Sequence, residues 1–133
     1  MCKCSGQCGC NITSTTKGEK GDASPVASLG YKVYKALISQ SSTSAPTVIV
    51  LQNTLSAAIV WTRDGAGVYL GTLVGAFTAD KTFLHQPSQN NSNMSIVLLR
   101  NDSDTVEIDT FDNTNTLADG LLNKNSICIE VYN

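Results

Sequence analysis

Residues 127–132 read Ile-Cys-Ile-Glu-Val-Tyr, with an aliphatic side chain at every second position. Successive side chains of a β-strand point to opposite faces of a sheet, so this spacing predicts a strand with its three aliphatic side chains on a core face. Cys128, Glu130 and Tyr132 then lie on the opposite face. Residues 105–111 repeat the alternation. The spacing therefore favours half-buried β-strands as the main element of the chain.

The rest of the chain after residue 30 has the same character. Short runs rich in Val, Ile, Thr and aromatic residues alternate with clusters of Gly, Pro, Asn, Asp and Ser, and no helical repeat persists for more than about two turns. The expected strands are residues 31–39, 47–53, 58–63, 68–74, 81–85, 94–100, 105–111 and 126–132. Eight short strands with polar connections predict an all-β fold, a small antiparallel β-sandwich or jelly roll.

Two of these segments are apolar without interruption, at residues 48–51 and 96–99. A strand that is covered on both faces has this composition. We therefore expect these strands to pack on the core with one face and on neighbouring subunits with the other.

Composition limits the classes of partner. The 133 residues are 41% hydrophobic and 15% charged, which suits one domain with a single core. The net charge of −2 argues against nucleic acid or an anionic membrane as a partner. No apolar run approaches the ~18 residues of a membrane-spanning helix, and residues 1–10 lack the apolar stretch of a secretory signal. We expect synthesis in a cytoplasm without membrane insertion.

The first 30 residues differ from the rest. Cysteines stand at Cys2, Cys4, Cys8 and Cys10, and two Gly-x-y triplets begin at Gly18 and Gly21. Glycine at every third position is the requirement of a collagen triple helix, in which only glycine fits the crowded axis. The sequence thus predicts an extended Cys-rich, collagen-like stalk over residues 1–30 and a globular knob over residues 31–133.

Three uses of the four clustered cysteines remain open. Four thiolates can bind zinc tetrahedrally, although the Cys-x-Cys spacing departs from the Cys-x2-Cys pairs of common structural sites. In an oligomer the thiols can form interchain disulfides after release from a reducing cytoplasm. They can also pack as small side chains into a socket on another protein.

The knob also carries a set of recognisable segments. They read Ala-Pro-Thr-Val-Ile-Val-Leu-Gln-Asn-Thr-Leu at 45–55, Ile-Val-Trp-Thr-Arg at 59–63, Gly-Val-Tyr at 67–69, Gly-Ala-Phe-Thr at 75–78 and Lys-Thr-Phe at 81–83. Together with the short Gly-x-y stretch, they resemble the trimeric head fibre of crAss-like bacteriophages, whose hosts are Bacteroidetes-type bacteria.

This resemblance implies a structural protein without enzymatic activity. The implied assembly is a homotrimer, formed in the cytoplasm of the bacterial host and displayed on the virion surface as a head or tail fibre. Residues 1–17 would attach it to the capsid or another virion protein, and the knob would face host-surface glycans. Two triplets are too few to hold three chains together, so we expect the knob to carry the trimer contacts.

A different class is the alternative: a monomeric carbohydrate-binding module or an inactive hydrolase-like domain. Four aromatic residues, Trp61, Tyr69, Phe77 and Phe83, can form a platform on which a sugar stacks. A sandwich of about 100 residues also needs large side chains in its core, and we favour that use of them.

Catalytic and calcium-binding arrangements have little support. His85 is the only histidine and stands beside a Gln-Pro turn, where we expect an exposed or capped loop residue. Cys128 is expected to be a small buried hydrophobe, and the two would pair only if two strands brought them together by chance. The acidic residues Asp102, Asp104, Glu107, Asp109 and Asp112 lack the order of an EF-hand, so a solvated strand face with flanking turns is the better interpretation.

Overall fold

The computed structural model describes residues 30–89 and 93–133. The four clustered cysteines, the two Gly-x-y triplets and the proposed attachment segment 1–17 lie outside the described residues. The expectations of zinc, disulfides or a collagen-like stalk in this region therefore stay predictions.

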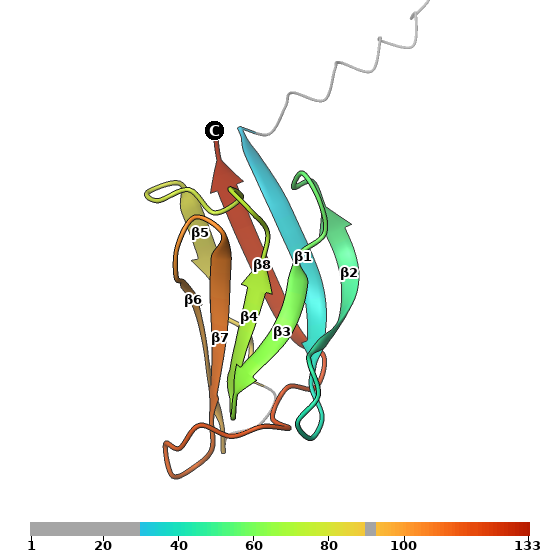
Figure 1. Cartoon of the computed structure of the whole chain (residues 1–133), viewed down its shortest axis with the longest axis vertical. Helices are drawn as coiled ribbons and strands as arrows, with labels where there is room; N and C mark the ends of the chain where they lie inside the picture. Colours follow the sequence, from blue (N-terminus) through green and yellow to red (C-terminus); the bar gives the residue numbers. More distant parts are fainter. Residues whose placement is uncertain (1–29, 90–92) are drawn as a thin grey trace, which may run out of the picture.

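The knob is an all-β sandwich, as the sequence predicts. Its strands are β1 (Tyr31–Ser39), β2 (Thr47–Asn53), β3 (Val60–Gly65), β4 (Val68–Thr72), β5 (Thr82–His85), β6 (Ser95–Arg100), β7 (Thr105–Phe111) and β8 (Asn125–Tyr132). Each boundary falls within two residues of the expected one. The strands form two four-stranded sheets, sheet A in the order β2-β1-β8-β5 and sheet B in the order β3-β4-β7-β6 (Figure 1). Every pairing of strands is antiparallel.

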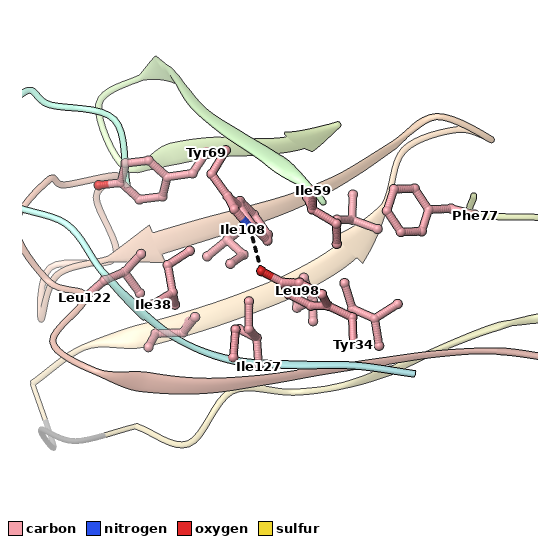
Figure 2. Close-up of a cluster of buried hydrophobic side chains, with 14 of the residues drawn as sticks. Tyr34, Ile38, Ile59, Tyr69, Phe77, Leu98, Ile108, Leu122 and Ile127 are labelled. Atoms are coloured by element: carbon pink, nitrogen blue, oxygen red, sulfur yellow. Dashed lines mark hydrogen bonds between the residues drawn. The ribbon is translucent and has the colours of Figure 1, made fainter. Parts of the chain in front are cut away.

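The core lies between the two sheets and is built by alternation. The buried side chains of β8 are those of Ile127, Ile129 and Val131, which confirms the face predicted for residues 127–132. The other large contributors to the buried cluster are Tyr34, Ile38, Ile59, Trp61, Tyr69, Phe77, Ile96, Leu98, Val106, Ile108 and Leu122 (Figure 2). The indole Nε1 of Trp61 donates a hydrogen bond to the Tyr34 hydroxyl at 3.4 Å, which satisfies a buried donor between the sheets.

One end of the sandwich holds the start of β1 and the end of β8, and the opposite end holds the connections within four pairs of consecutive strands. Tyr31 of β1 pairs with Tyr132 of β8, and the backbone N–H of Asn133 donates to the carbonyl of Gly30 at 3.0 Å. We call this the terminal end (Figure 1). Because all pairings are antiparallel, the β1–β2, β3–β4, β5–β6 and β7–β8 connections all lie at the opposite, distal end.

For the two uninterrupted apolar segments, packing on the core with one face is confirmed for β6, while cover of the other face by neighbouring subunits stays a prediction. β2 is an edge strand, and β6 buries Ile96 and Leu98 while Val97 and Leu99 lie on the outward face of sheet B and are partly exposed. Within the described residues, the chain itself covers neither outward face. When the outward positions of a strand are also aliphatic, the sequence does not show whether one face or both faces of the strand are buried.

Candidate functional site

One side of the sandwich presents an apolar edge, which we define as Ile49, Val50 and Leu51 of β2 with Val60 of β3. These side chains are 54%, 48%, 64% and 62% exposed. β2 and β3 are edge strands of their sheets, and they lie on the side away from β5 and β6, which contact each other (Figure 1).

The apolar edge has only part of the usual protection of a free strand. Edge strands in soluble proteins are usually shortened, bulged or supplied with charged residues or proline, which prevent pairing with another chain. β2 runs for seven residues, Thr-Val-Ile-Val-Leu-Gln-Asn, without a charge or a proline, and a register shift in its pairing with β1 leaves Leu51 as an extra residue. Ile49 and Val50 point to opposite faces of sheet A, since they pair with Leu37 and the buried Ala36. Exposed aliphatic side chains on a strand of this kind are typical of an interaction surface.

A network of hydrogen bonds and one ion pair connects polar side chains at the distal end. Arg63 of β3 forms an ion pair with Asp119 of the β7–β8 connection, with Nη2 2.7 Å from Oδ2 and Nε 3.1 Å from Oδ1. Asp119 Oδ1 also accepts the backbone N–H of Gly67 at 3.1 Å and lies 2.9 Å from the Tyr69 hydroxyl. The bond from Arg63 is the main reason that the pKa of Asp119 is lowered from its ordinary 3.8 to about 2.

Gln40 continues this network into the β1–β2 turn. Its Oε1 accepts the backbone N–H of Gly120 at 2.6 Å and lies 3.0 Å from the Tyr69 hydroxyl. Its Nε2 donates to the carbonyls of Ser42 and Ser44 at 2.6 and 3.0 Å. Burial, and then the bond to Asp119, raise the pKa of Tyr69 to about 12, so the phenol keeps its proton at neutral pH.

Beside this network the distal end has an open groove of about 530 Å³, lined by residues of the 39–47 and 120–123 segments. Its lining is mostly small hydroxyl and amide side chains and contains no aromatic ring. Trp61, Tyr69 and Phe77 are buried in the core, as favoured from the sequence. Phe83 is 55% exposed on the outward face of sheet A, so these four aromatic side chains do not form one exposed platform.

The acidic residues of the 102–112 segment divide into turn caps and strand residues. Asp102 Oδ1 accepts the backbone N–H groups of Asp104 and Thr105 at 2.7 and 2.8 Å, and these bonds with that from the Thr105 hydroxyl lower the pKa of Asp102. Asp112 Oδ1 caps the next turn in the same way through Thr114 and Thr116, with the same direction of pKa shift. These two carboxylates thus accept hydrogen bonds from backbone N–H groups of their own turns.

Glu107 and Asp109 occupy the outward face of β7, where alternation places them, but neither is fully solvated. Both are partly buried, and Asp109 Oδ1 is buried without a hydrogen-bond partner among the described residues. Burial, and secondly the charge of Glu107, raise the pKa of Asp109. A charge held under these conditions costs stability.

His85 lies at the end of the strand predicted over residues 81–85 and is exposed, as expected, whereas Cys128 differs from its sequence expectation. The register of the β5–β8 pair sets His85 directly opposite Cys128. Cys128 is half-buried on the outward face of sheet A and is not a core residue. Strand pairing therefore produces the proximity that the sequence alone offered only as chance. Alternation already assigned Cys128 and Glu130 to one face, but no local pattern identifies the strand beside them.

Comparisons of the chain with known protein families, with curated proteins and with solved structures give no match. Among the described residues, no helix has the length and apolar character needed to cross a membrane.

Proposed function

We propose that this chain is the subunit of a homotrimeric bacteriophage fibre, fixed to the virion through residues 1–17 and exposing its β-sandwich knob. The observation that carries the assembly is the apolar edge, because exposed aliphatic side chains on a strand without charge or proline mark a surface for contact with another chain. The phage assignment rests on the resemblance of the 45–83 segments and on the Gly-x-y triplets. The role is structural and adhesive, without catalysis.

The occupant of the apolar edge in this proposal is a second copy of the chain. Two Gly-x-y triplets order only six residues, whereas burial of apolar side chains contributes about 25 cal/mol per Å² of surface removed from water. In a closed ring of three copies each edge contacts a neighbour, so no edge strand stays free.

The direction of the fibre supports the same proposal. Residues 1–29 join the knob at Gly30, at the terminal end, while the four distal connections and their groove lie at the other end. A knob attached at its terminal end presents these connections outward, where contact with a host-surface glycan takes place. The hydroxyl and amide groups of its lining can form hydrogen bonds with the hydroxyl groups of such a ligand.

Light scattering after size exclusion tests the assembly. The full chain is expected to have the mass of three chains, and Leu51→Lys on the apolar edge is expected to reduce it to one. Val74→Lys is the matched control, because Val74 is 79% exposed and lies at the terminal end, outside the apolar edge. A monomeric full chain would overturn the trimer and favour the carbohydrate-binding module.

Attachment is tested separately on particles. Deleting residues 2–10 is expected to leave a folded, trimeric knob that no longer joins virions. Particles decorated at full occupancy by this deletion variant would contradict the proposed role of the cysteine segment, whatever the oligomeric state.

A further inference from the structure

The outward face of sheet A brings together three potential metal ligands of different chemistry. His85 of β5 is the cross-strand partner of Cys128 of β8, and Glu130 lies two residues further along β8 on the same face. One ligand atom from each of the three residues lies within 4.8 Å of the other two. His85 Nε2 lies 3.4 Å from Glu130 Oε1. In the part of the chain that the structure describes, no other group of three such ligands converges.

These distances suit a single ion. Zinc binds nitrogen, sulfur and oxygen ligands at about 2.0–2.3 Å in a tetrahedral arrangement, which places two ligand atoms roughly 3.3–3.8 Å apart. All three separations are within 4.8 Å, so shifts of about 1 Å or less in the ligand atoms reach this range. Three protein ligands leave the fourth position open for water or another group.

Neighbouring side chains already orient two of the ligands. The Tyr132 hydroxyl donates to Glu130 Oε2 at 3.0 Å, which leaves Oε1 directed at His85. The Phe83 ring meets the His85 imidazole edge to face, with centroids 4.8 Å apart, and restricts its rotation. Contacts of this kind commonly fix metal ligands and raise their affinity.

The same three groups are poorly suited to nucleophilic catalysis. Burial, and secondly the charge of Glu130, raise the pKa of the Cys128 thiol, although Lys35, its partner on β1, acts in the opposite direction. The thiol thus stays protonated at neutral pH, whereas a catalytic cysteine needs a lowered pKa. A divalent cation reverses this preference, since it replaces the thiol proton and is attracted by Glu130.

We propose that His85, Cys128 and Glu130 bind one zinc-class divalent ion on the outward face of sheet A. Mixed nitrogen, sulfur and oxygen ligation selects Zn²⁺ or Co²⁺ over Mg²⁺ and Ca²⁺, which prefer oxygen alone. The site is complete within one chain, so it does not depend on the proposed trimer or on the virion.

The test must exclude the cysteines of residues 1–10, which are themselves candidate zinc ligands. We would replace Cys2, Cys4, Cys8 and Cys10 by Ser in the full chain, which leaves Cys128 as the only thiol of the five. Calorimetric titration of this background with ZnCl2 is expected to give one ion per chain. Titration with CoCl2 is expected to give the near-ultraviolet charge-transfer band of a single cobalt–thiolate bond.

Substitutions in this background identify the ligands. Cys128→Ser is expected to abolish the thiolate band and, like His85→Asn, to weaken zinc binding more than about tenfold. Glu107→Gln is the matched control for Glu130→Gln, because it removes the same charge from the outward face of the other sheet, and it is expected to leave binding unchanged. His85 is 46% exposed at its side chain, so its replacement reports on binding even if a Cys128 variant fails to fold.

Two outcomes would overturn the proposal. One is a background chain that takes up no zinc or cobalt. The other is uptake that His85→Asn and Glu130→Gln leave unchanged, which would place the ion elsewhere.

Discussion

The guanidinium group of Arg63 meets the carboxylate of Asp119 side by side, with Nη2–Oδ2 at 2.7 Å and Nε–Oδ1 at 3.1 Å. The two residues are 56 positions apart in the sequence. This pair, with Tyr69 and Gln40, joins β3, β4, the β1–β2 turn and the β7–β8 connection at the distal end. The distal connections that we propose to face the host are therefore held by side chains and not only by their own turns.

Asp119 makes the stability of the knob depend on acid pH. Its pKa is lowered from 3.8 to about 2 in the folded state, so between these values the unfolded chain binds more protons. The stabilisation is present above about pH 4 and is lost as the pH falls towards 2. Thermal unfolding from pH 7 to 2 is expected to show a weaker acid dependence for Asp119→Asn than for the wild type. Asp64→Asn, a change at an exposed carboxylate of β3, is the control and should keep the wild-type profile.

Asp109 is expected to lower the stability of the knob as the pH rises, the opposite of the effect of Asp119. Its pKa is raised by burial and by Glu107, so the folded chain binds more protons just above pH 3.8, and stability falls as the pH rises through this window. Asp109→Asn should therefore raise the Tm at pH 7, and the gain should shrink in acid. Asp112→Asn removes a carboxylate that caps a turn, and it should lower the Tm at pH 7. A lower Tm for Asp109→Asn would show that the charge has a partner that offsets its burial.

Gly67 occupies a position that only glycine fits. Its φ is +71°, and a Cβ there would lie 2.6 Å from both the backbone N of Ala118 and the carbonyl O of Thr110. Gly67→Ala is expected to cost about 2 kcal/mol or more in the free energy of unfolding, from left-handed backbone and steric overlap together. Gly75→Ala separates the two causes, since Gly75 has φ +67° and nothing within 4 Å of its Cβ position. Urea unfolding should show a loss of only about 1 kcal/mol there.

Two phenylalanines of the knob allow the contribution of a buried ring to stability to be compared with that of an exposed ring. Phe77 has no exposed surface and packs in the core from the β4–β5 connection (Figure 2), whereas Phe83 is 55% exposed on sheet A. Phe77→Ala is expected to reduce the free energy of unfolding by about 3–5 kcal/mol. Phe83→Ala should cost less than about 1 kcal/mol, because much of its ring already contacts water. Equal losses in equilibrium unfolding would indicate that sheet A is covered in solution.

The sequence by itself determined which segments are strands and, where aliphatic and polar residues alternate, which side chains face the core. The alternation at 127–132 placed Ile129 inside and Cys128 and Glu130 outside, because side-chain direction in a strand is a local property of the backbone. The tertiary structure alone decided that β2 is an edge, that His85 lies beside Cys128, and that Arg63 reaches Asp119. The two side-chain relationships join residues 43 and 56 positions apart, and all three depend on which strands pair. Strand pairing depends on the entropy lost when the chain between two strands closes into a loop and on the apolar surface that the whole core buries. A short sequence pattern contains information on neither quantity.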